Sequence, residues 1–251
     1  MKTSFLVLAS VLACLGACQS PRGAPPTPST PSDQPTATAT TAPGTAAAPV
    51  QPAASGSGSR ATGFDTQAAD ATPEGFLFGR TGRGAVGRWV VRAEADAPSK
   101  PNVLAQLDAD RTDYRFPIAV SAEPGLRDVR VTVRCKAVSG KVDEACGLVA
   151  RYRDENNYYV TRANALEDNI RLYFVRDGSR EQLASWSGKV TPNVWHEYRF
   201  ELRGDHLEVA WDGQKVLDHH DSTFADAGRA GVWTKADSVT YFDDLKIEAL
   251  P

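Results

Sequence analysis

The sequence lacks the short motifs that mark several large functional classes. It contains no Gly-x-Ser-x-Gly elbow, no His-Glu-x-x-His pair and no phosphate-binding loop. It also lacks an arginine-rich run, and its formal net charge of −3 argues against a polyanionic partner. Standard serine hydrolases, zinc proteases and P-loop enzymes are therefore not indicated, and we expect no nucleic-acid partner.

Cysteine is scarce, and two of the 4 cysteines lie in a short N-terminal apolar segment that is too short to span a bilayer. Residues 1–18 predict a secretory signal, and Leu15-Gly16-Ala17-Cys18 resembles the lipobox of bacterial lipoproteins. The resemblance implies export and a lipid on Cys18, which would attach the protein to a membrane of the bacterial cell envelope. Gln19 rather than Asp after the cysteine favours the outer membrane. An ordinary signal peptide cleaved nearby is the alternative.

Charge is nearly absent from residues 19–60, where Asp33 is the one charged residue between Gly23 and Ser59. Proline, alanine, threonine and serine dominate this stretch and cannot bury enough apolar surface to offset the entropy of ordering. We therefore predict a disordered tether that spans on the order of 35 Å. Residues 61–251 remain, which suits a single domain.

No convincing amphipathic helix is present in the domain, apart from a turn at 164–168. Alternation of apolar and polar residues predicts strands instead. In residues 128–138, for example, Val129, Val131, Val133 and Cys135 share one face. The expected strands are 128–138, 146–153, 157–163, 169–175, 181–186, 196–203, 206–211, 214–218, 230–234 and 239–250. This pattern indicates an all-β, two-sheet antiparallel sandwich in which each sheet has one dry face and one wet face.

Two local expectations follow from the same alternation. The Asp212-Gly213 dipeptide predicts a tight hairpin in which Val209 faces Val216. Cys135 and Cys146 fall on the apolar faces of two strands that follow each other along the chain. Because exported proteins meet an oxidising environment, a disulfide between them is expected, with two buried thiols out of register as the alternative.

Three stretches carry a resemblance to a known superfamily: GLVARYRDENNYYVTRAN (147–164), WHEYRFELRGDHLEVAWDGQKV (195–216) and AGVWTKADSVTYFDDLKI (230–247). They resemble the concanavalin-A-like lectin and glucanase jelly rolls, and within them exported domains grouped with 3-keto-disaccharide hydrolases and laminin-G-like modules. The resemblance covers roughly residues 64 to 250. It implies a concanavalin-A-like jelly roll with a sugar site on the concave sheet, but no particular activity.

Strand parity then selects candidate ligand residues for that sheet. Because an unpaired buried arginine is costly, Tyr158 and Arg162 are predicted to face outward. Polar residues of the 164–168 turn lie beside them, and Trp186 is the expected exposed stacking surface. The complete set of ligand-binding candidates is Arg151, Tyr158, Arg162, Asn164, Glu167, Asp168, Arg171, Tyr173 and Trp186.

Catalytic and metal sites receive weaker support. A retaining glucanase of this fold needs closely spaced acids on one strand, and the Glu-x-Asp-x-(x)-Glu pattern is missing. Glu167, Asp168 and Glu197 are the candidate acids of a different hydrolase. Adjacent residues of 218–221 (Asp-His-His-Asp) point in opposite directions and cannot all reach one ion. We therefore expect no cofactor, although Asp243 and Asp244 could hold a structural calcium ion.

Three functions remain open at this point. The first is an exported, lipid-anchored module that binds a carbohydrate or envelope glycan. The second is a glycoside hydrolase of the 3-keto-disaccharide hydrolase type, and the third is a surface module without a ligand. In each case a monomer is expected.

Overall fold

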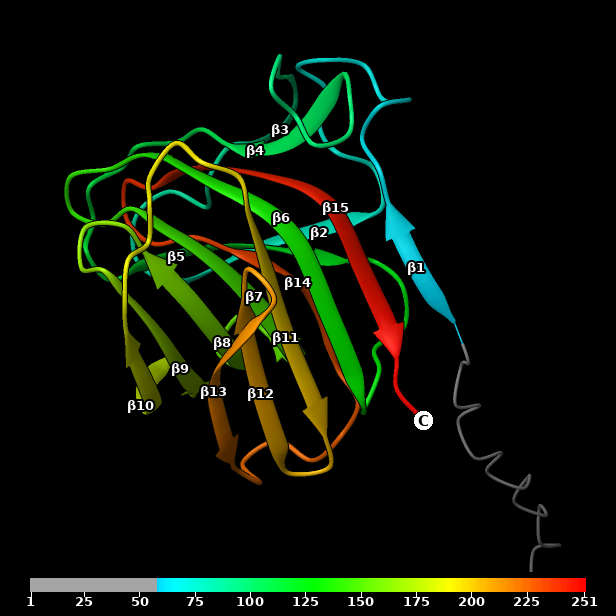
Figure 1. The fold of residues 1–251 in the computed structure, drawn as a ribbon, viewed down its shortest axis with the longest axis vertical. Coiled ribbons are helices and arrows are strands. Elements are labelled where there is room, and N and C mark those ends of the chain that lie inside the picture. Colours follow the sequence, from blue (N-terminus) through cyan, green and yellow to red (C-terminus); the bar gives the residue numbers. More distant parts are fainter. Residues whose placement is uncertain (1–57) are drawn as a thin grey trace, which may run out of the picture. The chain divides into compact units, whose positions relative to one another are not determined.

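The computed structural model describes residues 58–251, which form only strands, turns and loops (Figure 1). The predicted signal peptide, the lipid attachment at Cys18 and nearly all of the predicted tether lie outside these residues. Within the described part of the chain, no helix has the length and apolarity to cross a membrane.

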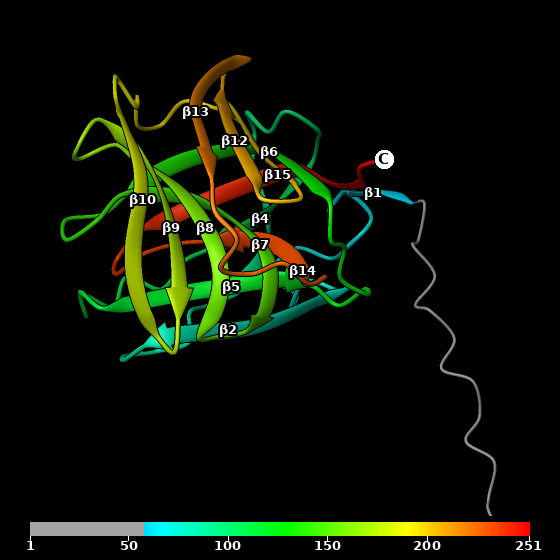
Figure 2. The ribbon, with the colours of Figure 1, turned by 90° about the horizontal axis from the view of Figure 1, so that it is seen from below.

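Two antiparallel sheets pack face to face, so the predicted all-β, two-sheet jelly-roll sandwich is confirmed (Figures 1 and 2). Sheet A has the order β13-β12-β11-β6-β15-β4-β3, and β1 also pairs with β15. Its strands are β1 (Ser59–Thr62), β3 (Trp89–Ala93), β4 (Asn102–Gln106), β6 (Val129–Ser139), β11 (His196–Arg203), β12 (His206–Trp211), β13 (Gln214–His220) and β15 (Val239–Ala249).

Sheet B has the order β10-β9-β8-β7-β14-β5-β2. Its strands are β2 (Phe76–Gly82), β5 (Arg115–Ser121), β7 (Ala145–Asp154), β8 (Asn157–Asn164), β9 (Asn169–Arg176), β10 (Ser179–Ser187) and β14 (Arg229–Trp233). The sheet is strongly twisted, since β2 and β5 run across the direction of β9 and β10 in Figure 2.

The main core lies between the two sheets and uses the apolar face of each strand. Sheet A contributes Val131 and Phe200, and sheet B contributes Leu148 and Leu172. Val131, Leu172 and Phe200 each have a charged neighbour in the sequence, and this alternation is the signal that predicted their strands. The residues of β6, β9 and β11 that face the main core are therefore those that the sequence pattern predicted.

Sheet B has a second apolar face, which contradicts the expected wet face. We call the side of sheet B that is turned away from sheet A the outer face. It carries a buried cluster that is separate from the main core: Phe116, Ile118, Val120, Ala145, Val149, Tyr158, Val160, Tyr173, Val175 and Trp233. The sheet is therefore apolar in its centre on both sides, and polar side chains are confined to its ends and edges.

The expected disulfide is not formed, because Cys135 and Cys146 are both buried free thiols. The sequence suggested that their strands are neighbours, but β6 pairs with β11 and β15, whereas β7 pairs with β8 and β14. The thiols thus meet across the main core from opposite sheets. Burial in apolar surroundings raises the pKa of Cys135, which keeps it protonated.

Two further expectations need correction in detail. The Asp212-Gly213 hairpin forms, but Val209 pairs with Leu217 because the register shifts after Val209. The sandwich also begins earlier than residue 61, since Ser59 already pairs with Glu248. Strands β1 to β5 lie before residue 128, where the expected strands begin.

Candidate functional site

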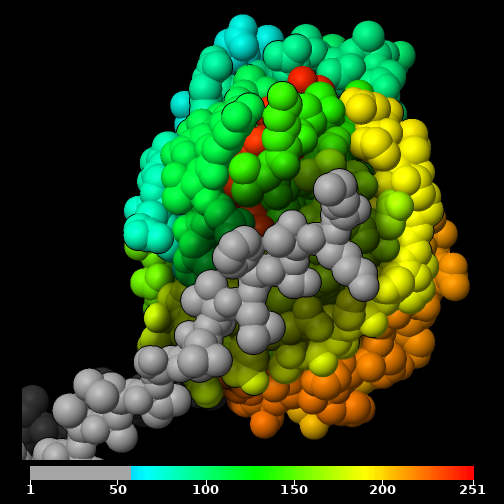
Figure 3. All heavy atoms as spheres, turned by 90° about the vertical axis from the view of Figure 1, so that its left-hand side faces the viewer, coloured from blue at the N-terminus to red at the C-terminus, as the bar shows by residue number. Residues whose placement is uncertain are grey.

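Four of the predicted ligand residues lie on the outer face of sheet B. Tyr158 and Arg162 come from β8, and Arg171 and Tyr173 come from β9. Tyr158, Arg162 and Tyr173 are buried, whereas the Arg171 side chain is 34% exposed. Figure 3 views the molecule from the side of β9 and β10, with residues of β8 and β9 in olive between the green and orange segments. The predicted facing is correct, but the open polar patch is smaller than expected.

Glu167 is the centre of a polar network at the turn between β8 and β9. Its Oε2 accepts hydrogen bonds from Arg162 Nη2 and Asn169 Nδ2, both at 3.0 Å, and lies 3.2 Å from Arg171 Nη2. Burial tends to raise its pKa, but the hydrogen bond from Asn169 and the charge of Arg162 outweigh burial and lower the pKa to about 2. Glu167 is therefore ionised at neutral pH. Because its side chain is 40% exposed, a ligand can reach it as a hydrogen-bond acceptor. We call Arg162, Glu167, Asn169 and Arg171 the β8–β9 network.

Asn164 shapes the turn instead of facing a ligand. Its Oδ1 accepts hydrogen bonds from the backbone N–H groups of Leu166 and Glu167, and its Nδ2 donates to Asp143 Oδ1 at 3.0 Å. Lys235 Nζ lies 2.9 Å from the other oxygen of Asp143. Burial raises the pKa of Asp143 despite the charge of Lys235. Asp143 and Lys235 come from loops remote in sequence, so no local pattern could identify them.

Arg180 is a part of the outer face that the sequence did not suggest. From the edge strand β10 its guanidinium lies 4.3 Å from the ring centroid of Tyr173 and 4.8 Å from that of Phe116. Arg180 therefore covers the aromatic cluster through cation–π contacts. Its Nη1 is buried without a hydrogen-bond partner in residues 58–251, as is Nε of Arg162. Both N–H groups are thus buried on the same face without an acceptor.

Arg151 does not belong to this site, contrary to the prediction. Its backbone adopts a φ of 47°, and the register of β7 shifts at this point. The shift turns the fully buried guanidinium toward the loops at one end of the sandwich, where it donates to the backbone carbonyls of Arg127, Phe224 and Gly204. It also moves Tyr152, which was expected in the main core, to the outer cluster. Arg151 is therefore a structural residue.

Asp168 and Trp186 also differ from the prediction. Asp168 accepts hydrogen bonds from the Val190 backbone N–H at 3.1 Å and from Lys189 Nζ at 3.1 Å, and these two contacts lower its pKa. Trp186 packs against the main core, which lies on the opposite side of sheet B from the network. The reason is a register shift in β10 between Gln182 and Ala184, which reverses the facing of the residues that follow.

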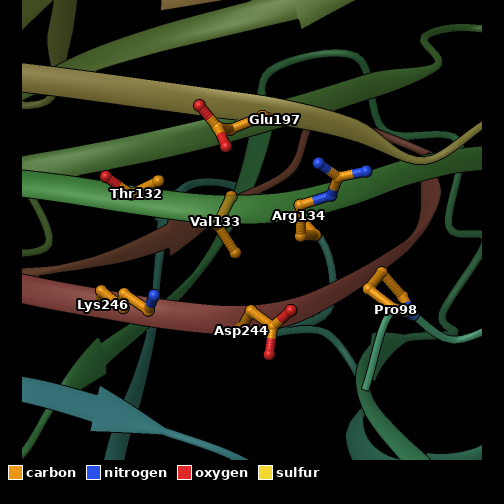
Figure 4. A pocket seen from close by; sticks show the side chains of 7 residues that line it. All are labelled: Pro98, Thr132, Val133, Arg134, Glu197, Asp244 and Lys246. Carbon is orange, nitrogen blue, oxygen red and sulfur yellow. The ribbon is translucent and has the colours of Figure 1, made fainter. Parts of the chain in front are cut away.

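Glu197 lies on the other sheet and shares no site with Glu167 or Asp168. It borders a hollow of about 350 Å³ on the outer side of sheet A, together with Arg134 on β6 and Asp244 and Lys246 on β15 (Figure 4). In the register, Arg134 lies opposite Glu197 on one side and Asp243 on the other. A cationic side chain thus separates the acids of neighbouring strands.

The possible calcium ligands are engaged by one loop. Asp243 accepts the backbone N–H groups of Ser99 and Asp244, each at 2.8 Å, and Asp244 Oδ1 accepts from Ser99 Oγ at 2.6 Å. Burial raises the pKa of Asp243 to about 6, against the effect of both backbone hydrogen bonds. These contacts fix the loop to β15, and a calcium ion at this position stays a prediction.

A second hollow, of about 670 Å³, lies at the end of the outer face away from the β8–β9 network. Tyr152, Glu155, Asn157 and Arg229 are among its lining residues, and Leu77 adds an apolar surface. Burial, followed by the charge of Glu155, raises the pKa of Tyr152 to about 12, so its hydroxyl stays protonated. The outer face therefore has polar groups at both ends of β8, with aromatic residues between them.

Glu167 and Asp168 lack the property that the general acid of a glycoside hydrolase needs. A general acid must be protonated near neutral pH, which needs a raised pKa. The pKa values of Glu167 and Asp168 are lowered instead. Asp143 does have a raised pKa, but its carboxylate is held by Asn164 and Lys235. The network offers charged hydrogen-bonding groups that its own contacts hold in place.

No protein-family model matches the chain. A levanase of Bacillus subtilis (strain 168) is 25% identical over 99 residues, which are 39% of this chain and 14% of the levanase. The carbohydrate binding module CBM66 from Bacillus subtilis has a TM-score of 0.54 and 22% identity over 70% of this chain and 96% of that chain. A Bacillus subtilis protein of unknown function with a galectin-like fold has a TM-score of 0.49 and 11% identity, with 75% and 98% of the two chains covered. The likeness to the binding module shows the fold, a jelly-roll sandwich.

Proposed function

We propose that this sandwich is a carbohydrate-binding module whose glycan lies on the outer face of sheet B, at the β8–β9 network. The observation that carries the proposal is the partly exposed pair Glu167 and Arg171, which Arg162 and Asn169 hold in a fixed geometry. Such pre-ordered charged groups lose little conformational entropy when a ligand binds.

The chemistry of the network suits vicinal hydroxyl groups. Glu167 accepts hydrogen bonds in its ionised form, and Arg171 supplies several N–H donors from one planar group. Arg162 and the aromatic cluster under Arg180 are buried and support the network from below. The hydroxyl groups of a sugar match the exposed charged groups of Glu167 and Arg171.

The comparisons support the same class of ligand. The similar proteins include a carbohydrate binding module and a levanase, although the levanase match covers 14% of that protein. Levan is therefore the first polysaccharide to test, followed by glycans of the bacterial envelope. We do not propose the hydrolase alternative, because Glu167 and Asp168 are held ionised.

The proposal is tested by measuring glycan affinity of the full chain with isothermal titration calorimetry or affinity electrophoresis. We expect Arg171→Ala and Glu167→Gln each to weaken binding at least tenfold, because a charged hydrogen bond contributes about 1.5–3 kcal/mol. Arg199→Ala is the matched control. Arg199 pairs with Thr132 in sheet A, faces away from the main core and should leave affinity unchanged.

Two outcomes would contradict the proposal. Binding that survives Arg171→Ala but is lost in Tyr152→Ala would move the glycan to the second hollow at the other end of β8. No binding to levan or to any envelope glycan would favour a surface module without a ligand.

A further inference from the structure

The hairpin of β12 and β13 brings two imidazoles and a carboxylate together at the edge of sheet A, away from the proposed glycan site. His206 Nε2 lies 2.7 Å from Asp218 Oδ1, and the rings of His206 and His220 stack with their centroids 4.7 Å apart. One ligand atom from each of the three side chains lies within 4.8 Å of the others. No other such group of three is found among residues 58–251.

The register of the hairpin explains this convergence. His206 on β12 pairs directly with His220 on β13, and directly opposed side chains of antiparallel strands lie close together. Asp218 is two residues before His220 and therefore shares its face, whereas His219 points to the other side of the strand. The sequence argument against a metal considered adjacent residues of 218–221 and missed the partner from the opposite strand.

Neighbouring charges support a cation at this position. His220 Nδ1 lies 3.3 Å from Asp205 Oδ1, which leaves Nε2 free and reproduces the carboxylate–histidine pairing that orients metal-binding imidazoles. Lys215 Nζ contacts Asp218 Oδ2 at 2.5 Å and Glu208 Oε1 at 2.8 Å. Without an ion, this ammonium group supplies the positive charge between the two carboxylates.

We propose that His206, Asp218 and His220 bind a divalent transition-metal ion such as Zn²⁺. Two imidazoles with one carboxylate favour borderline ions over Ca²⁺ or Mg²⁺, which prefer oxygen ligands. Ligand bonds of about 2.0–2.2 Å place tetrahedral ligand atoms about 3.3 Å apart, so the side chains need shifts on the order of 1 Å. The three side chains are 31%, 45% and 65% exposed, which leaves them room to move. A fourth position stays open to water or to an outside ligand.

The test is calorimetric titration of the full, metal-free chain with Zn²⁺, with Ca²⁺ as the comparison ion. We expect one Zn²⁺ per chain, at least tenfold weaker binding in His206→Ala and in His220→Ala, and no saturable binding of Ca²⁺. Bound Zn²⁺ should also raise the melting temperature, because it binds only the folded hairpin. His219→Ala is the matched control and should bind Zn²⁺ as the unmodified chain does.

A third variant distinguishes a metal-binding site from a group of charged side chains that binds no metal. Lys215→Met removes the ammonium group that competes for Asp218, so Zn²⁺ affinity should rise several-fold. The proposal is overturned if Zn²⁺ does not bind saturably, if His219→Ala weakens binding as much as His220→Ala does, or if Lys215→Met weakens it.

Discussion

At the scale of single residues, Arg151 shows where alternation along a strand stops being informative. Its neighbours Leu148 and Ala150 face the main core as the pattern predicts. One residue in the left-handed region then breaks the period, and Arg151 is buried although it was expected outside. A bulge adds a residue without changing composition or hydropathy, so the sequence alone cannot reveal it. Trp186 was expected to be exposed because it lies near a loop, but after the bulge in β10 it packs against the main core.

Removing the buried guanidinium should be costly. Arg151→Leu would leave the carbonyls of Arg127, Phe224 and Gly204 without their donor in the interior. Because unsatisfied buried polar groups cost about 1–3 kcal/mol each, we expect the free energy of unfolding to fall by about 3 kcal/mol or more in urea denaturation. The control is Arg153→Leu, whose side chain is 40% exposed and pairs with the exposed Asp226, and the expected loss is below about 1 kcal/mol. Equal losses in the two variants would contradict a structural role for Arg151.

The facing of the side chains in the β8–β9 network was predicted correctly, whereas the facing of Arg151 was not. The reason is that β8 and β9 pair without a bulge, so successive side chains keep alternating between the two faces. Arg162, Glu167 and Arg171 do meet, as the sequence suggested. What it could not provide was the burial of Arg162, or the nearby residues Asp143, Lys235 and Arg180. Contacts between distant segments leave no periodic signal.

At the scale of elements, the packing of β7 against β14 depends on Gly147. Gly147 pairs with Trp233, and a Cβ at residue 147 would lie 2.7 Å from the indole ring. The large ring therefore lies across the strand only because residue 147 has no side chain.

We therefore expect Gly147→Ala to lower the free energy of unfolding by about 1–3 kcal/mol through overpacking. Gly63→Ala is the control, since a Cβ at Gly63 has no atom within 4 Å and its backbone is not in the left-handed region. The measurement is the free energy of unfolding of both variants in thermal or urea denaturation. A Gly147→Ala protein as stable as the unmodified chain would show that the ring can shift at no cost.

The pairing of the strands shows which features the sequence pattern predicts and which it does not. The β12–β13 hairpin was expected because its Asp-Gly turn is a local signal, although its register is shifted after Val209. The partners of β6 and β7 were wrong, because a strand that follows in the chain need not be a neighbour in the sheet. Cys135 and Cys146 therefore lie on opposite sheets, where both are free thiols.

At the scale of the whole molecule, the two-sheet sandwich followed from many short alternating strands and polar turns, and this inference is confirmed. The second apolar face of sheet B was missed because β8 (NYYVTRAN) carries polar residues among its apolar ones and lacks the continuous apolar run that is typical of strands buried on both faces. The overall architecture was thus more predictable than the exposure of any one face.

The two thiols report on the integrity of the whole sandwich. Cys135 and Cys146 are buried between the sheets, so we expect neither to react with a thiol reagent in the folded protein. In a urea series, both should become reactive in the same transition that changes tryptophan fluorescence, because the sheets share one core. Peptide mapping after alkylation without reductant identifies the labelled sites. Peptides joined through Cys135 and Cys146 would contradict the free-thiol state.

Both sheets contain a late strand between two early ones, and this arrangement has a consequence for biosynthesis. In sheet A, β15 lies between β6 and β4, and in sheet B, β14 lies between β7 and β5. A nascent chain that ends before residue 229 therefore keeps four interior strand edges without partners. Such edges can pair with other chains, and pairing across long sequence separations is slow. Both sheets therefore become complete only when β14 and β15 have been synthesised. A prematurely terminated chain should be more prone to aggregation than the finished protein.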